Sequence, residues 1–188
     1  MSLNTLEEIA EYIVSDGKGI LAADESNPTC GKRFDSIGVE STETNRRDYR
    51  EMLFRSAGMQ DNIGGVILFD ETIRQNAEDG TALIDVIKDQ GALPGIKVDK
   101  GLASIDSSPE ETVTQGLDGL DERCKEYFLL GAKFTKWRAV IKISDNIPSE
   151  TCIKANMRAL ARYAKIVQNN KMVPMVEPEV LMDGVHSI

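Results

Sequence analysis

Short apolar runs recur along this chain, and longer amphipathic stretches separate them. Most of the runs are rich in Val, Ile and Leu and are bounded by Gly or Pro, as buried parallel strands are. The runs are residues 19–23, 64–69, 94–98, 133–143 and 172–177. Parallel strands need long crossover connections, which are usually helices. The alternation therefore predicts an α/β fold, either an open doubly wound sheet or a (β/α) barrel.

The stretches between the runs carry apolar residues at the spacing of a helix. Thr5 and Glu8 have the spacing of a capping box, and Ser149 opens the last predicted helix. Residues 19–26 (GILAADES) resemble residues 65–72 (GVILFDET), which supports a repeated β/α unit. The apolar stripes are Leu6, Ile9, Ile13 and Val14; Met52, Leu53 and Ala57; Leu83, Val86 and Ile87; and Ile153, Met157, Leu160, Ala164 and Val167.

Composition narrows the classes of function. No linker, low-complexity tract or charge block interrupts the chain, so we expect residues 1–188 to form a single domain. The net charge of −9 argues against a nucleic-acid partner, although a local cluster of cations can still bind a small anion. No apolar run reaches the roughly 18 residues of a membrane span, and no signal-peptide pattern is present. We therefore expect a cytoplasmic protein without a membrane partner.

The metal-binding and nucleophilic residue types are few. Cys30, Cys124 and Cys152 are in no CxxC spacing, so we expect reduced, buried thiols that are neither a disulfide framework nor a zinc site. His186 is the single histidine, which argues against a histidine-rich zinc site and against a histidine base. The glycine fingerprints of dinucleotide and P-loop sites are missing. We expect neither a metal nor a cofactor.

Charged side chains gather where the predicted strands end. They are Asp24 after the first run, Lys97 in the third, Lys136 and Arg138 on one face of the fourth, and Glu177 and Glu179 in the fifth. Burying an unpaired charge is costly, so these groups must pair with one another or meet a ligand. Strand-end residues of a barrel converge at its carboxyl-terminal mouth, where catalysis occurs, and this favours the barrel. A structural network of salt bridges is the alternative interpretation.

This set of side chains contains lysines, an arginine and carboxylates, without a histidine or a metal site. Such a set favours carbonyl chemistry through a Schiff base. A lysine among other cations has a lowered pKa, and its neutral amine can attack a ketone. Carboxylates then move the protons, while Lys and Arg bind a phosphate. Lys18, Lys88 and Lys165 lie outside the strand ends and are expected to be solvated.

At these residues the sequence resembles class I fructose-bisphosphate aldolase. The resemblance is collinear and covers essentially the whole chain. It rests on the segments DGKGILAADES (16–26), NRRDYREMLF (45–54), GGVILFDET (64–72), GIKVDKG (95–101), TQGLDGLDERC (114–124), KFTKWRAVIKI (133–143), ARYAKIVQ (161–168) and VPMVEPEVL (173–181).

The resemblance implies a (β/α)₈ TIM barrel, here a partial barrel of about five strands. It also implies metal-independent cleavage of fructose 1,6-bisphosphate to dihydroxyacetone phosphate and glyceraldehyde 3-phosphate, in glycolysis and gluconeogenesis. The partner would be a phosphorylated sugar, and the full-length family is usually homotetrameric. Another phosphosugar enzyme on the same fold is a further possibility.

Four catalytic residues follow from the resemblance. Asp24 would act near the C4 hydroxyl of the sugar, and Lys136 would assist formation and dehydration of the carbinolamine. Glu177 would shuttle protons, and Glu179 would support the charge network.

Five residues are implied to bind the substrate. Ser26, Lys97 and Arg138 would contact its phosphates and hydroxyls, and Arg33 and Arg46 are weaker candidates. Thr29 takes the place of a second hydroxyl residue that the family often has shortly after the AADES segment.

The family's Schiff-base lysine lies on the sixth strand, which the resemblance places beyond Ile188. We therefore expect the chain to be the N-terminal portion of such an aldolase, without its nucleophile. The alternative is a non-catalytic half-barrel that binds sugar phosphates or a complementing partner.

Overall fold

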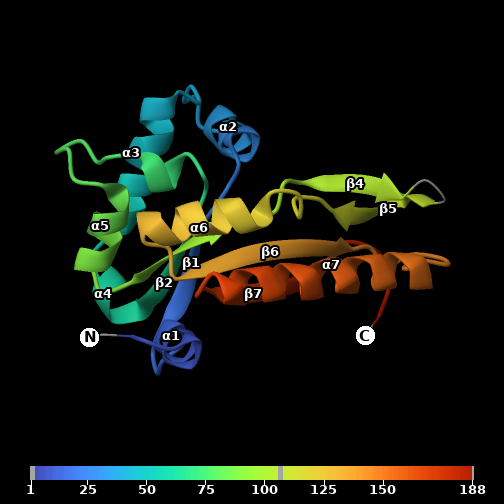
Figure 1. Ribbon diagram of the computed structural model, residues 1–188. Coiled ribbons are helices and arrows are strands. Elements are labelled where there is room, and N and C mark those ends of the chain that lie inside the picture. Colours follow the sequence, from blue (N-terminus) through green and yellow to red (C-terminus); the bar gives the residue numbers. More distant parts are fainter. Residues whose placement is uncertain (1–2, 106–107, 188) are drawn as a thin grey trace.

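One curled parallel sheet forms the centre of the computed structural model, which describes residues 3–105 and 108–187 (Figure 1). The strand order is β1-β2-β3-β6-β7. The strands are β1 (Gly19–Ala23), β2 (Ile63–Leu68), β3 (Leu93–Lys97), β6 (Phe134–Ile141) and β7 (Val173–Val180). Each lies within two or three residues of a predicted apolar run. The five-stranded partial barrel predicted from the sequence is confirmed.

Helices connect the strands and lie mostly on one face of the sheet. They are α1 (Leu6–Ile13), α2 (Asn27–Asp35), α3 (Glu43–Phe54), α4 (Met59–Asn62), the 3-10 turn η1 (Thr72–Arg74), α5 (Leu83–Asp89), α6 (Leu120–Leu130) and α7 (Glu150–Asn169). The predicted caps are confirmed. Thr5 and Glu8 form a reciprocal capping box at α1, and the Ser149 hydroxyl accepts from Cys152 N at the start of α7. Within the described residues, no helix is both long and apolar enough to cross a membrane.

The outer face of the sheet packs under the helices. Thr135, Trp137 and Ala139 of β6 are fully buried there, as predicted from the alternation of β6. The ring of Trp137 lies 5.3 Å from that of Tyr163 of α7, and the Tyr163 hydroxyl is 2.6 Å from Thr135 Oγ1. This packing leaves Lys136 and Arg138 on the inner face.

A smaller apolar cluster closes the amino-terminal end of the inner face. Ile9 and Ile13 of α1 pack there with Ile67 and Phe134. The Phe134 ring lies over Gly95, where an added Cβ would be 2.3 Å from a ring carbon. Apolar packing fills this end of the sheet, so the inner-face charges are left at the opposite, carboxyl end.

The predicted apolar stripe of α3 is confirmed only at Leu53, which packs against the core, and is wrong at Met52 and Ala57. Met52 is 60% exposed, whereas Arg50 and Phe54 are the buried residues of this helix. The buried face follows Arg50 because its charge is paired with a carboxylate below the helix, so a polar residue occupies a core position. Val14 is also exposed, because it lies at the C-cap of α1, beyond the helical residues.

The first half of the predicted α7 stripe is displaced in the same way. Ile153 and Met157 are 40% and 37% exposed, whereas Cys152 and Asn156 are buried. The Asn156 amide donates to Thr112 O at 2.8 Å. It thereby fixes an antiparallel hairpin of β4 (Leu102–Ile105) and β5 (Ser108–Thr114) that the sequence analysis did not predict.

Candidate active site

Strand register brings charged side chains together at the carboxyl edge of the sheet. Lys97 of β3 is the register partner of Lys136 of β6. On the next strand, Glu177 of β7 pairs with Arg138. Asp24 follows the last residue of β1 at the same edge. Parallel strands all end on the same side, so these groups converge although they are far apart in the sequence.

Lys136 lies between two carboxylates. Its Nζ is 3.2 Å from Asp24 Oδ2 and 3.3 Å from Glu177 Oε2. All three side chains are at least half-buried. Burial lowers the pKa of the Lys136 amine, but the charges of Asp24 and Glu177 more than offset this effect, so its pKa is raised. Lys136 is therefore a protonated ammonium at neutral pH.

A second ion pair lies further along the same two strands. Arg138 Nε donates to a carboxylate oxygen of Glu179, and both side chains are more than one-third exposed. This pair does not contact Lys136 directly, but Glu177 lies between the two sites on β7. Glu179 thus neutralises Arg138 and leaves Glu177 to Lys136.

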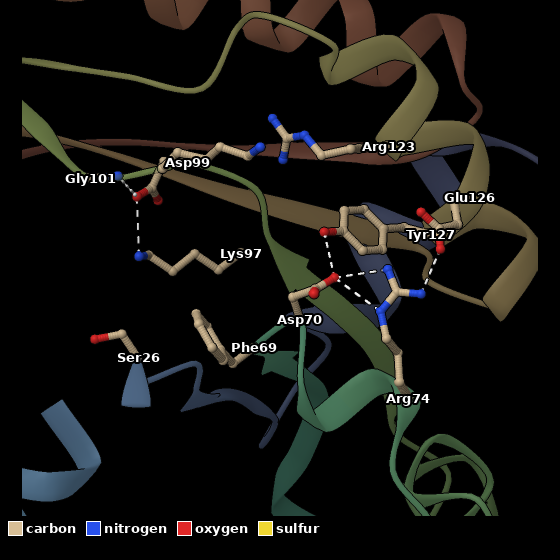
Figure 2. Close-up of a pocket in the computed structure, with 11 residues that line it drawn as sticks. Ser26, Phe69, Asp70, Arg74, Lys97, Asp99, Gly101, Arg123, Glu126 and Tyr127 are labelled. Atoms are coloured by element: carbon tan, nitrogen blue, oxygen red, sulfur yellow. Dashed lines mark hydrogen bonds and ion pairs between the residues drawn. The ribbon is translucent and has the colours of Figure 1, made fainter. Parts of the chain in front are cut away.

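Lys97 faces a cavity of about 520 Å³ beside the Lys136 site (Figure 2). Its Nζ is 3.1 Å from Asp99 Oδ1. The Asp99 side chain is only 5% exposed, and its second oxygen has no hydrogen-bond partner among the described residues. Ser26 lines the same cavity, and its hydroxyl is 3.0 Å from Thr29 Oγ1. The cavity thus offers a cation and a hydroxyl to a polar ligand, with the Asp99 carboxylate buried beside them.

The far wall of this cavity is an ion-paired cluster that the sequence analysis missed (Figure 2). Arg74 of η1 donates to Asp70 at 2.9 Å and pairs with Glu126 of α6 at 2.5 Å. The Tyr127 hydroxyl donates to Asp70 at 2.8 Å. Burial, together with the Asp70 carboxylate, raises the pKa of Tyr127 to about 12, so its phenol stays protonated.

The resemblance between residues 19–26 and residues 65–72 could have identified Asp70 as a site residue, because it aligns Asp70 with Asp24. The structure shifts this correspondence by one residue. Ala23 pairs with Leu68, so Phe69 takes the position next to Asp24 and Asp70 lies one residue further. Asp70 therefore reaches the outer wall of the cavity and not the Lys136 site.

Two arginines proposed as weaker substrate contacts lie outside the cavity. Arg33 is 60% exposed and pairs with Glu25 at 2.8 Å. Arg46 forms a two-point contact with Glu71, at 2.7 and 2.6 Å. Neither residue lines the cavity that contains Lys97, because each guanidinium is drawn to a carboxylate near α2 or η1.

No cluster in the described part of the chain offers three or more His, Cys, Asp or Glu side chains for a metal ion. The three cysteines are buried and unbridged, as expected. Burial raises the pKa of the Cys124 thiol to about 11, which keeps it unreactive. The chemistry available at this edge is that of lysines, carboxylates and hydroxyls.

The fold and the site together define a protein of the (β/α)-barrel class with a lysine–carboxylate centre at the carboxyl ends of its strands. Residues 5–188 match the glycolytic family described as fructose-bisphosphate aldolase class I. The chain belongs to this family.

Relatives and a solved structure agree with this assignment. The chain is 55% identical to a probable fructose-bisphosphate aldolase class 1 of Xanthomonas campestris, over 100% of this chain and 56% of the relative. It is 56% identical to the cytosolic fructose-bisphosphate aldolase 6 of Arabidopsis thaliana, over 95% of this chain and 50% of the relative.

A solved structure of fructose-bisphosphate aldolase from Plasmodium falciparum, in complex with TRAP and a small-molecule inhibitor, superposes with a TM-score of 0.95. It is 50% identical and covers 97% of this chain and 53% of the solved one. The chain thus spans about half the length of the relatives that it matches.

Proposed function

We propose that this chain carries the proton-handling part of a class I fructose-bisphosphate aldolase site. The reaction is the metal-independent cleavage of fructose 1,6-bisphosphate to dihydroxyacetone phosphate and glyceraldehyde 3-phosphate. The observation that carries the proposal is the position of Lys136, 3.2 Å from Asp24 and 3.3 Å from Glu177 at the mouth of the half-barrel. Family membership supplies the reaction that such a group of residues would serve.

Each residue of the group has a role that fits its surroundings. Asp24 accepts or orients the proton of the C4 hydroxyl as the carbon–carbon bond breaks. Protonated Lys136 stabilises negative charge on the carbinolamine oxygen and gives a proton to the departing water. Glu177 would accept the proton that the attacking amine loses as the carbinolamine forms and pass it to Lys136, because its carboxylate lies next to Lys136 Nζ. Glu179 keeps Glu177 available by neutralising Arg138.

The phosphates of the substrate would be bound by cations and hydroxyls at the same edge. Lys97, Ser26 and Arg138 lie nearest to the Lys136 layer. Arg33 and Arg46 would contribute only after release from Glu25 and Glu71. Breaking such ion pairs is feasible because a phosphate dianion offers a guanidinium equivalent two-point bonding.

A cleavage assay tests this function. Triose phosphate released from fructose 1,6-bisphosphate is measured for the wild-type sequence and for Asp24→Asn and Glu177→Gln, each joined to the remaining C-terminal part of the Xanthomonas campestris relative, which would supply the Schiff-base lysine. We expect each variant to lower kcat by about 10²- to 10⁴-fold with a smaller change in KM, as for loss of an acid or base. Lys88→Met is the control, because Lys88 is an exposed residue of α5 paired with Asp85. An Asp24→Asn variant that cleaves at the wild-type rate contradicts the proposal.

A second candidate is a half-barrel that binds sugar phosphates without cleaving them. The observation that favours it is that the two lysines facing the site, Lys97 and Lys136, are each ion-paired with carboxylates. A Schiff base requires a neutral amine. Borohydride reduction in the presence of dihydroxyacetone phosphate, read by mass spectrometry, tests whether residues 1–188 hold a Schiff-base amine. We expect no adduct, and a stable adduct would place the nucleophile within the chain and exclude the non-catalytic half-barrel.

Three further properties belong to the same proposal. The chain would work as one barrel domain, since its described strands share a single sheet. It would act in the cytoplasm, which the cytosolic designation of the Arabidopsis relatives supports. The full-length family is usually homotetrameric, and we extend this assembly to the present protein.

A further inference from the structure

Arg50 of α3 is buried behind the loop that follows β1. Its side chain is 2% exposed. The Nε atom donates to Ala23 O at 2.8 Å, and Nη2 donates to Glu25 O at 2.9 Å. These two carbonyls belong to the residues on either side of Asp24. One guanidinium therefore holds the main chain before and after the Asp24 carboxylate.

Further contacts fix the guanidinium itself. Arg50 Nη1 donates to Cys30 Sγ at 3.0 Å, and Nη2 lies 3.1 Å from Glu25 Oε2. Glu25 is in turn bound by the Tyr49 hydroxyl at 3.1 Å. A buried cation is tolerated only when it is paired and hydrogen-bonded, and Arg50 meets both conditions. Each of the three guanidinium nitrogens of Arg50 therefore has a partner.

The arrangement requires the shape of arginine. Its planar guanidinium directs N–H groups along fixed, divergent directions, so it can reach two carbonyls and a carboxylate at once. A lysine at position 50 would keep the charge but would offer one ammonium group on a flexible stem. It could not hold both carbonyls with the same geometry.

We infer that Arg50 is a positioning residue for Asp24, which it holds within ion-pair distance of Lys136 by clamping the carbonyls of Ala23 and Glu25. This inference deepens the proposed function and rests on it, because there Asp24 handles a proton. Arg50 itself does not line the cavity beside Lys136.

The pKa of the Lys136 ammonium depends on the distance between its Nζ and the Asp24 carboxylate, so it reports whether Arg50 holds Asp24 in place. Lys136 is faced by Asp24 and Glu177 across the strands, by Lys97 on β3 and by Arg138 on its own strand. If Asp24 moves away, Lys136 loses one of two anions and its apparent pKa falls. Removal of a nearby cation by itself would raise that pKa. Loss of the Asp24 position and loss of a nearby positive charge therefore shift the pKa of Lys136 in opposite directions.

The experiment measures the reactivity of Lys136 toward trace acetic anhydride as a function of pH, with peptide mass spectrometry as the readout. Asp24→Asn gives the reference shift for complete loss of the anion. We expect Arg50→Lys to lower the apparent pKa of Lys136 by at least half of that reference shift. Tyr49→Phe is the matched control and should leave the pKa unchanged, because both carbonyl contacts of Arg50 remain.

A second variant avoids an unpaired buried charge. Glu25→Gln combined with Arg50→Met removes both ions of the buried pair, which proteins often tolerate. It also removes one cation and one anion, so direct electrostatic effects on Lys136 nearly cancel. The lost clamp should again lower the Lys136 pKa. Circular dichroism establishes that each variant is folded.

An unchanged or raised Lys136 pKa in either folded variant overturns the inference. Loss of the fold in both variants also overturns it, since Arg50 would then serve the fold and not the position of Asp24. The readout uses no sugar phosphate and no cleavage. A failed clamp is thus distinguishable from a failed aldolase site.

Discussion

Lys136 is the residue on which the proposed site depends most, because its ammonium is the shared partner of Asp24 and Glu177. Its pKa is raised above 10.5, the value of an unperturbed lysine here. A raised pKa means that the folded state binds the proton more tightly than the unfolded state does. Lys136 therefore contributes stability below the unfolded pKa, and this contribution is lost as pH rises through the folded pKa.

This linkage predicts how stability changes with pH. Lys136→Met should lower the free energy of unfolding by about 1–3 kcal/mol at neutral pH, because two half-buried carboxylates lose their cation. The deficit should persist up to about pH 10.5 and shrink above it. Urea unfolding between pH 7 and pH 11.5 measures it. Lys165→Met, at an exposed position on α7, should track the wild type throughout. A deficit that grows above pH 10.5 would refute the assigned sign.

At the scale of elements, the two ends of the sheet's inner face differ. Tightly packed apolar side chains fill the amino-terminal end, and charged side chains lie at the carboxyl end. The Phe134 ring of β6 lies against Gly95 of β3, its register partner. This contact lets β3 and β6 pack with α1 below them. Lys97 and Lys136 then follow two residues later on the same strands, at the opposite end of the face.

Gly95→Ala should disturb this packing. The added Cβ would be 2.3 Å from a Phe134 ring carbon, so the ring or a strand must move. We expect a loss of about 1–3 kcal/mol in the free energy of unfolding. Gly19→Ala is the matched control on β1, because nothing lies within 4 Å of its Cβ position. Equal stabilities of the two variants in chemical denaturation would show that Phe134 does not hold the strands in this way.

The strands could be predicted from the sequence because buried parallel strands are apolar along their whole length. The buried face of α3 and the hairpin were not predicted, because both depend on buried polar side chains. Helix α3 buries Arg50, whose partner Glu25 lies in a loop about 25 residues earlier, and the hairpin is anchored by Asn156. Hydropathy periodicity does not register a buried charge or amide that has a partner distant in sequence.

Some residues of the candidate site could likewise be predicted from the sequence, and others could not. Strand-end position and alternation were sufficient to select Asp24, Lys136 and Glu177. Asp70 and Tyr127 escaped notice, because Tyr127 comes from a helix and its role depends on how α6 lies over η1. Residues from helices that reach a cavity require the three-dimensional packing and not only the strand pattern.

At the scale of the whole molecule, three cations gather at one edge of an acidic chain, each beside at least one carboxylate. The chain carries a net charge of −9, yet Lys97, Lys136 and Arg138 lie on adjacent strands at one edge. A bisphosphate would therefore bind this edge by replacing carboxylates as the partners of these cations, and its binding should weaken with salt. The outer edges of β1 and β7 have no partner strand among the described residues, so this site lies in an open half-barrel.

The central claim is that this edge binds a sugar bisphosphate through Lys136 and its neighbours. Calorimetric titration of the chain with fructose 1,6-bisphosphate tests it most directly, with unphosphorylated fructose as the ligand control. We predict one binding site per chain, at least a tenfold loss of affinity in Lys97→Met and in Lys136→Met, and no change in Lys165→Met. A chain that does not bind the bisphosphate, or a Lys136→Met variant that binds it as tightly as the wild type, would contradict the account.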